Sequence, residues 1–235
     1  MKKAVKWFVP IFIILLLAGS FLVYAGIYYH ADATALAALE SDDAVSVTPV
    51  SYGWFFDGPS AEDVLIFYPG AKVEETAYAP LLHELAGKGM DVCLVKMPLR
   101  FAFFGTDKAD AVIRMYDYEH CYIGGHSLGG AMAAEFAAGH SDQLTGLILL
   151  AAFPTKQISD ELLEISIYGS EDRVLNMAKI EAGRALAPAD YFEYRIEGGN
   201  HAQFGNYGVQ KGDGAAAITG PEQQQSAVDF IIQHN

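Results

Sequence analysis

The chain alternates short apolar runs with segments in which apolar residues recur at helical spacing. Short apolar runs bounded by Gly, Pro, Asp or Asn predict buried strands. We expect strands at 45–50, 52–56, 64–68, 91–96, 120–124, 146–152, 164–168 and 191–196. We expect helices within 76–88, around 108–115, at 130–139, and within 172–186 and 221–233. Repeated strand–helix units predict an α/β fold, with a mostly parallel central sheet and helices on both faces.

The connection at 153–163 is too short to hold a separate lid domain. Functional sites of open parallel sheets gather at the carboxyl ends of the strands. We therefore expect an open cleft at that edge of the sheet, without a large lid.

The uncharged apolar stretch at 7–29 is long enough to cross a bilayer as a helix. We favour an uncleaved anchor at 1–29, a polar linker at 30–44 and one folded domain at 45–235. Lysines before the stretch and acidic residues after it predict a single-pass protein of the cell membrane, with its domain outside the cytoplasm. A cleaved signal peptide, giving a secreted protein, is the alternative, because 31–33 and 33–35 both have the small-x-small form.

The chain is acidic, with a net charge of −14, and its first 30 residues contain three lysines and no acid. A negatively charged domain repels phosphate backbones, so a nucleic-acid partner is not expected, and membrane contact should come from apolar residues. Cys93 and Cys121 both lie in expected strands and lack a CxxC spacing. We interpret them as core residues rather than a redox pair.

One pentapeptide, Gly125-His126-Ser127-Leu128-Gly129, stands between an expected strand and an Ala-rich expected helix. A serine in a G-x-S-x-G turn of this kind sits on a strained bend that only small neighbours permit, and its hydroxyl is lifted out of the sheet. The helix that follows directs its dipole toward developing negative charge. The position of the motif, more than the motif itself, indicates that Ser127 is a nucleophile.

A serine hydroxyl needs a base, and the base needs a carboxylate that orients it. Asp172 and His201 each follow an apolar strand through a short polar loop, so both are expected at the carboxyl edge of the sheet. We interpret His201 as the base and Asp172 as its partner. The alternative for Asp172 is a cap on a helix that begins near Arg173. His126 should point away from the serine and serve in packing or as a pocket wall.

The chain order Ser127, Asp172, His201 resembles that of the α/β-hydrolase superfamily, over nearly all of 45–235. The chain is similar to the small, lidless esterase-like and dienelactone-hydrolase-like members, with Ser where dienelactone hydrolases carry Cys. The resemblance implies a catalytic triad and an acyl-enzyme on Ser127 that His201 helps to form and that water releases. No cofactor or metal is implied, and the expected partner is a small-molecule acyl substrate.

The resemblance also implies an oxyanion hole, which we assign to the backbone amides of Leu128 and Ala71. The second donor follows the strand at 64–68, where the chain reads Pro69-Gly70-Ala71 instead of the common His-Gly-Gly, so Gly70 could replace Ala71. Other side chains near expected strand ends are candidates for a substrate pocket. These candidates are Gly70, His126, Phe101, Phe103, Phe104 and Phe204. Core packing or contact with the bilayer is the alternative for the three phenylalanines at 101–104.

The function expected from this sequence is serine hydrolysis of small or medium acyl esters, of the carboxylesterase type. Acyl transfer on the same triad is a second possibility, because an alcohol or amine can displace the acyl group instead of water. A non-catalytic surface module that keeps the fold and binds a partner is a third, since a fold does not by itself imply a function.

Overall fold

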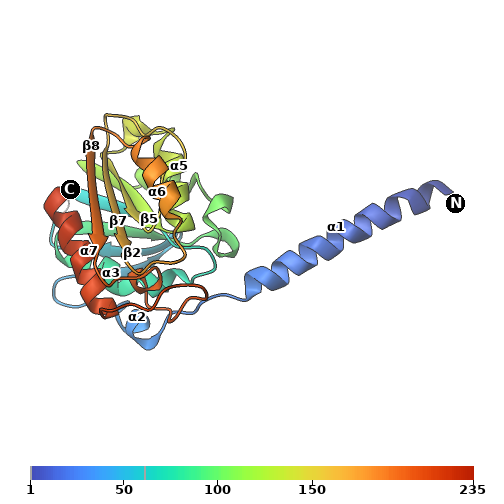
Figure 1. Cartoon of the computed structure of the whole chain (residues 1–235), viewed down its shortest axis with the longest axis horizontal. Coiled ribbons are helices and arrows are strands. Elements are labelled where there is room, and N and C mark those ends of the chain that lie inside the picture. Colours follow the sequence, from blue (N-terminus) through green and yellow to red (C-terminus); the bar gives the residue numbers. More distant parts are fainter. Residues whose placement is uncertain (1, 61) are drawn as a thin grey trace.

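The computed structural model describes residues 2–60 and 62–235, with side chains described at 9–60 and 62–235. Its centre is an eight-stranded sheet in the order β1-β2-β4-β3-β5-β6-β7-β8 (Figure 1). The strands are β1 (Ser46–Val50), β2 (Gly53–Asp57), β3 (Asp63–Tyr68), β4 (Met90–Val95), β5 (His120–His126), β6 (Gly146–Leu150), β7 (Leu163–Gly169) and β8 (Asp190–Ile196). Only β2 runs antiparallel to its two neighbours, and every other pairing is parallel. The predicted mostly parallel sheet is confirmed.

Helices cover both faces of the sheet, as the alternating pattern predicts. The helices are α1 (Lys2–Gly26), α2 (Ala33–Ala37), α3 (Ala79–Gly87), α4 (Lys108–Ile113), α5 (Leu128–Ala137), α6 (Met177–Arg184) and α7 (Gly220–His234). Leu65 of β3 packs in one core with residues of α3 and α7, whereas its neighbour Ile66 packs in another with residues of α4 and α5. Successive strand residues point to opposite faces, so the two cores lie on the two sides of the sheet.

Two helix starts differ from the sequence expectation. α5 begins directly after Ser127 rather than at 130, because the turn at the serine is a single residue long. The helix expected from 172 begins only at Met177, where the Asn176 side chain accepts a hydrogen bond from the amide of Ala178 and caps it. Asp172 therefore does not cap a helix, and its carboxylate is engaged elsewhere.

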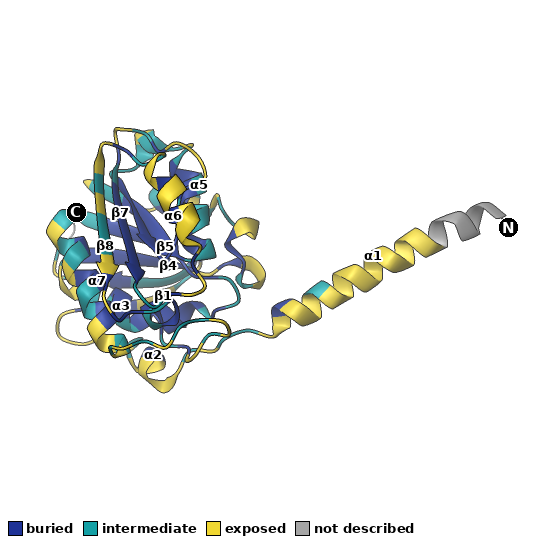
Figure 2. Ribbon diagram, in the orientation of Figure 1, coloured by how far each residue is buried: buried dark blue, intermediate teal, exposed yellow. Residues whose placement is uncertain are grey.

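Helix α1 leaves the domain, and nearly all of its residues at 9–26, where the structure describes side chains, are exposed (Figure 2). Its stretch Val9–Gly26 has a mean hydropathy of 2.3 and is long and apolar enough to cross a membrane, a property that signal sequences share. Residues 30–44, expected as a linker, lie against the domain: Ala35 of α2 is fully buried, and Tyr29 forms a parallel bridge with Val73. The segment after α1 is thus attached to the domain surface rather than hanging free.

Candidate active site

Strand β5 bends sharply into helix α5 at Ser127. Ser127 has φ 54° and ψ −122°, a backbone conformation that residues other than glycine rarely adopt. Its amide donates a 2.9 Å hydrogen bond to the carbonyl oxygen of Leu150 in β6, which fixes the bend against the neighbouring strand. The serine remains partly exposed at the carboxyl edge of the sheet. This is the sharp strand-to-helix bend that the G-x-S-x-G motif predicts, and we call it the elbow.

The glycines beside Ser127 are required by close backbone approach. A Cβ on Gly125 would lie 2.4 Å from the carbonyl oxygen of Tyr68, and one on Gly129 would lie 2.1 Å from the same oxygen. Both distances are far shorter than real Cβ contacts, so the end of β3 can pack against the elbow only if both positions lack a side chain.

His201 and Asp172 meet beside this elbow. The Nδ1 atom of His201 lies 2.7 Å from Oδ2 of Asp172, and both side chains are buried. The other oxygen of Asp172 accepts hydrogen bonds from the amides of Val174 and Leu175, at 2.9 and 2.8 Å. The contact with His201 and the bonds that close a turn therefore fall on separate oxygens of Asp172, and that turn lies before α6 rather than at the helix itself.

The other imidazole nitrogen of His201, Nε2, is buried and has no hydrogen-bond partner among the described residues. Ser127 and His201 line the same cavity, although no hydrogen bond joins their side chains in the part of the chain that the structure describes. Such bonds are often loose in resting enzymes and tighten when substrate binds. The structure thus brings Ser127 and His201 to one site, where Nε2 of His201 has no partner among the described residues.

Two polar side chains that the sequence did not single out hold the loop of His201. Asp213 accepts hydrogen bonds from the amides of His201 and Ala202, at 3.3 and 2.9 Å. The amide of Gln223, fully buried on α7, bonds both the N–H and the C=O of Asn200, at 2.9 and 2.8 Å. Asp213 and Gln223 come close to His201 only in the folded chain, and no local sequence motif marks them.

His126 belongs to a buried chain of hydrogen bonds behind Ser127. The amide of Gly70 donates to the Tyr78 hydroxyl at 3.0 Å, and that hydroxyl lies 2.9 Å from His126 Nδ1. Since the hydroxyl accepts from Gly70, it is free to donate to His126. Burial, and then the neighbouring imidazole of His201, lower the pKa of His126 well below its usual value, so the ring is neutral. Its centroid lies 4.5 Å from that of His201.

The hydrogen bonds around Gly70 decide which backbone amides are available for the expected oxyanion hole. The amide of Gly70 is occupied by Tyr78, and that of Lys72 donates to the carbonyl oxygen of Arg100 at 2.9 Å. The amide of Ala71, between them, bonds no acceptor within 2–60 and 62–235. On the other side, Leu128 supplies the first amide of α5, and the first amides of a helix have no acceptor within it. The arrangement favours Ala71 over Gly70 as the second donor.

The cavity at Ser127 has a volume of about 280 Å³ and is mostly apolar. Its lining residues are Ser127, Leu128, Ala131, Ala151, Ala152, Phe153, Val174, Leu175, Asn176 and His201. The walls come from α5, from the end of β6 and from the turn that Asp172 closes. Sequence reasoning missed the wall at Ala151–Phe153, although it directly follows a strand end at the expected edge.

The six candidate pocket residues lie outside this cavity. Phe101 and Phe104 contact Phe21 of α1, with their ring centroids 5.7 and 5.9 Å from that of Phe21, and Phe103 packs beside them with its ring tilted. Phe204 is fully buried, 5.7 Å from the ring of His126. His126 and Gly70 belong to the hydrogen-bonded chain behind the elbow. These six residues thus lie behind the elbow or against α1, and none of them lines the cavity at Ser127.

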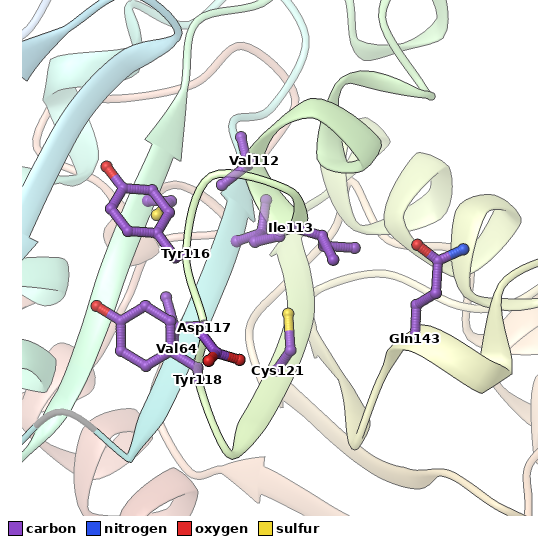
Figure 3. Close-up of a pocket in the computed structure, with 10 residues that line it drawn as sticks. Val64, Val112, Ile113, Tyr116, Asp117, Tyr118, Cys121 and Gln143 are labelled. Atoms are coloured by element: carbon purple, nitrogen blue, oxygen red, sulfur yellow. The ribbon is translucent and has the colours of Figure 1, made fainter.

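A second cavity of about 220 Å³ lies near the amino ends of β3 and β5, at the opposite edge of the sheet (Figure 3). It is lined mainly by apolar and tyrosine side chains, together with Cys93 and Cys121. Burial raises the pKa of both thiols to about 12, so neither is a thiolate nucleophile at neutral pH. Both cysteines are unpaired, as core residues would be. Within the described residues, no group of three or more His, Cys, Asp or Glu could hold a metal ion.

Comparison with known proteins agrees with this geometry. The model of the alpha/beta hydrolase family matches residues 64–225, which include the elbow, Asp172 and His201. No curated protein matches the chain.

Several solved structures share the fold at low sequence identity. The monoacylglycerol lipase of Paleococcus ferrophilus superposes with a TM-score of 0.61 at 13% identity, covering 81% of this chain and 99% of that one. The dienelactone hydrolase of Anabaena variabilis gives 0.58 at 12% identity, covering 82% and 97%. The esterase of Thermogutta terrifontis gives 0.54 at 15% identity, covering 80% and 91%. At such identities the likeness extends to the fold alone.

Proposed function

The chain belongs to the alpha/beta hydrolase family, and on that premise we propose that it is a serine hydrolase that cleaves small or medium acyl esters. The observation that carries the proposal is the buried 2.7 Å contact between His201 Nδ1 and Asp172 Oδ2, beside a cavity that His201 shares with Ser127. A buried carboxylate on Nδ1 fixes the tautomer in which Nε2 can take a proton. That nitrogen faces no other described partner.

The reaction would proceed through an acyl-enzyme. Ser127 Oγ attacks the ester carbonyl while His201 Nε2 takes the hydroxyl proton, and Asp172 stabilises the imidazolium that results. The carbonyl oxygen becomes an anion, which the amides of Leu128 and Ala71 would bind. His201 returns the proton to the leaving alcohol. Water, deprotonated by the same imidazole, then releases the acid.

The shape of the cavity supports substrates of limited acyl size. Its volume of about 280 Å³ is at the small end of ligand pockets, and its walls are formed chiefly by alanine, leucine, valine and phenylalanine side chains. Such a surface binds a short apolar acyl chain and contributes no charge to select an anionic one. Related proteins of the fold include a lipase, a dienelactone hydrolase and an esterase, which is consistent with this substrate class.

The test is hydrolysis of a chain-length series of p-nitrophenyl esters by the full chain in detergent. We expect turnover of short esters and loss of about 10⁴-fold or more of kcat in Ser127→Ala. Ser51→Ala is the matched control, because Ser51 is exposed and bonds no described residue. Equal turnover by Ser127→Ala and Ser51→Ala would remove the nucleophile assignment.

The same assay separates hydrolysis from acyl transfer. With an added alcohol or amine, a hydrolase continues to yield mainly the free acid, whereas a transferase yields the new ester or amide. A chain that binds ligands but turns over no member of the ester series would instead be a binding module.

We also propose that α1 stays on the mature protein as a single membrane anchor, with the domain outside the cytoplasm. Cleavage at either small-x-small site would remove Tyr29 and Asp32. The amide of Tyr29 donates to the carbonyl oxygen of Lys72 at 2.7 Å, and that of Asp32 to the carbonyl oxygen of Asn206 at 2.9 Å. The domain would lose these contacts beside its proposed oxyanion loop.

A further inference from the structure

The end of α1 is joined to the proposed active-site edge by backbone and ring contacts. Tyr29 bonds the chain on both sides of Val73: its amide donates to Lys72 O at 2.7 Å, and its carbonyl accepts from Glu74 N at 2.9 Å. The amide of Lys72 in turn donates to the carbonyl of Arg100. These bonds connect the chain after α1, the loop of Ala71 and the loop that follows β4.

Apolar side chains gather where α1 leaves the domain. The loop after β4 contains two 3₁₀ turns, η2 (Pro98–Arg100) and η3 (Ala102–Phe104). Three of their apolar side chains are exposed: Leu99 (43%), Phe103 (47%) and Phe104 (49%). These turns lie on the side of the domain from which α1 extends (Figure 1). We call Leu99, Phe103 and Phe104 the apolar rim. Exposed apolar surface next to a membrane-crossing helix has a ready partner in lipid.

The depth of the rim can be read from α1. Phe21 lies before the end of the apolar stretch Val9–Gly26, about 8 Å below that end at 1.5 Å of rise per residue. Phe101 and Phe104 both pack on the ring of Phe21. If α1 crosses a bilayer over this stretch, the rings that contact Phe21 lie at the same depth, within the leaflet on the domain's side.

Cations accompany the rim, although the domain as a whole is acidic. The ammonium of Lys72 lies 3.6 Å from the ring centre of Tyr24, and the guanidinium of Arg100 lies 3.3 Å from that of Tyr28. Tyrosines and basic side chains at the end of a membrane helix are typical of the headgroup region. Asp107 is the one acid in the depression that Phe103 and Phe104 line.

We propose that the apolar rim inserts into the leaflet around α1, so that the domain rests on the bilayer with the Ala71 loop facing lipid. The inference rests on α1 being kept as the proposed anchor, and not on the chemistry of Ser127. Lipid surrounds Leu99, Phe103 and Phe104, while Lys72 and Arg100 lie at the headgroups. The contacts of Tyr29 and Phe21 hold this orientation, so the active-site edge exchanges its ligands with the membrane surface.

The test is quenching of single tryptophans by lipid in the full chain. Trp7 and Trp54, the two native tryptophans, are replaced by phenylalanine, and one tryptophan is introduced as Phe104→Trp, Phe103→Trp or Phe192→Trp. Phe192, on the edge strand β8, is 37% exposed and is the matched control. Each chain is reconstituted into phosphatidylcholine vesicles with or without bromine on the acyl chains.

We expect brominated lipid to lower the emission of Phe104→Trp and Phe103→Trp about twofold or more, and to leave Phe192→Trp nearly unchanged. Circular dichroism and thermal unfolding of the same samples show that each is folded, and fluorophosphonate labelling tests the proposed function separately. Quenching at 103 and 104 equal to that at 192, in folded protein, would overturn the proposal. If one rim variant does not fold, the other decides.

Discussion

Asp172 divides two tasks between its carboxylate oxygens. Oδ1 closes the turn to Leu175, and Oδ2 orients His201. Since an asparagine keeps one acceptor oxygen and loses the negative charge, the two tasks can be separated by substitution at this one position.

We predict that Asp172→Asn lowers kcat about 10³–10⁴-fold, because the imidazole is no longer held in the tautomer that accepts the serine proton. Its melting temperature stays close to that of the unsubstituted chain, since the amide oxygen can still cap the turn. Asp172→Ala loses activity to the same extent and also about 1 kcal/mol of unfolding free energy with the cap. Ester hydrolysis and thermal unfolding measure both. Similar activity in the Asn variant and the unsubstituted chain would refute the role of Asp172.

We expect Tyr78 to act through its neighbours rather than on substrate. Its hydroxyl joins Gly70, beside the proposed oxyanion donor Ala71, to His126 behind the elbow. We predict that Tyr78→Phe lowers kcat about 10-fold with KM changed less than about twofold, a smaller loss than deleting an oxyanion donor outright. Tyr122→Phe is the control, because the Tyr122 hydroxyl bonds no described residue. A change in KM alone would mean that Tyr78 positions substrate and not the donor loop.

At the scale of elements, the elbow is a close packing of β3, β5 and α5. Gly129 is needed because the carbonyl of Tyr68 occupies the space of a Cβ, whereas a Cβ on Gly139, past the end of α5, would meet nothing closer than 3.7 Å. We predict that Gly129→Ala lowers the unfolding free energy by several kcal/mol or prevents folding, and that Gly139→Ala changes it by less than about 1 kcal/mol. Urea denaturation compares the two. Equal stability would mean that β3 can move away from the elbow.

Local pattern was enough to predict the sheet and the order of its strands and helices, because apolar periodicity and turn residues are local properties. It was also enough to place Ser127, Asp172 and His201 at the ends of separate strands. It did not find the cavity wall at 151–153 or the support from Asp213, since these depend on which loops meet in space. The phenylalanines at 101–104 were ambiguous for the same reason: their contact with Phe21 joins the end of α1 to the loop after β4, which lie far apart in the sequence.

At the scale of the molecule, one buried acid makes stability depend on pH. Glu164 of β7 is 1% exposed, its Oε2 has no partner among the described residues, and burial raises its pKa to about 8. In the unfolded chain a glutamate ionises near pH 4.5. The folded protein therefore retains a proton that the unfolded chain has lost, and stability falls as pH rises from about 4.5 to 8.

We predict that Glu164→Gln removes this contribution. At pH 5 the variant and the unsubstituted chain should have about the same unfolding free energy. At pH 9 the variant should be more stable by a few kcal/mol and should unfold at a higher denaturant concentration. Denaturation curves at both pH values give the difference. If the two proteins lose stability in parallel between pH 5 and pH 9, Glu164 is not protonated in the fold.

The central claim is that Ser127 is made nucleophilic by His201 and Asp172 at one edge of the sheet. The most direct measurement is reaction of the folded full chain with a fluorophosphonate, followed by mass spectrometry of its peptides. The account predicts one phosphonyl adduct, on the peptide that holds Ser127, formed far more slowly in Asp172→Asn and absent from Ser127→Ala. Folded protein that stays unlabelled, or Ser127→Ala that labels as fast as the unsubstituted chain, would contradict it.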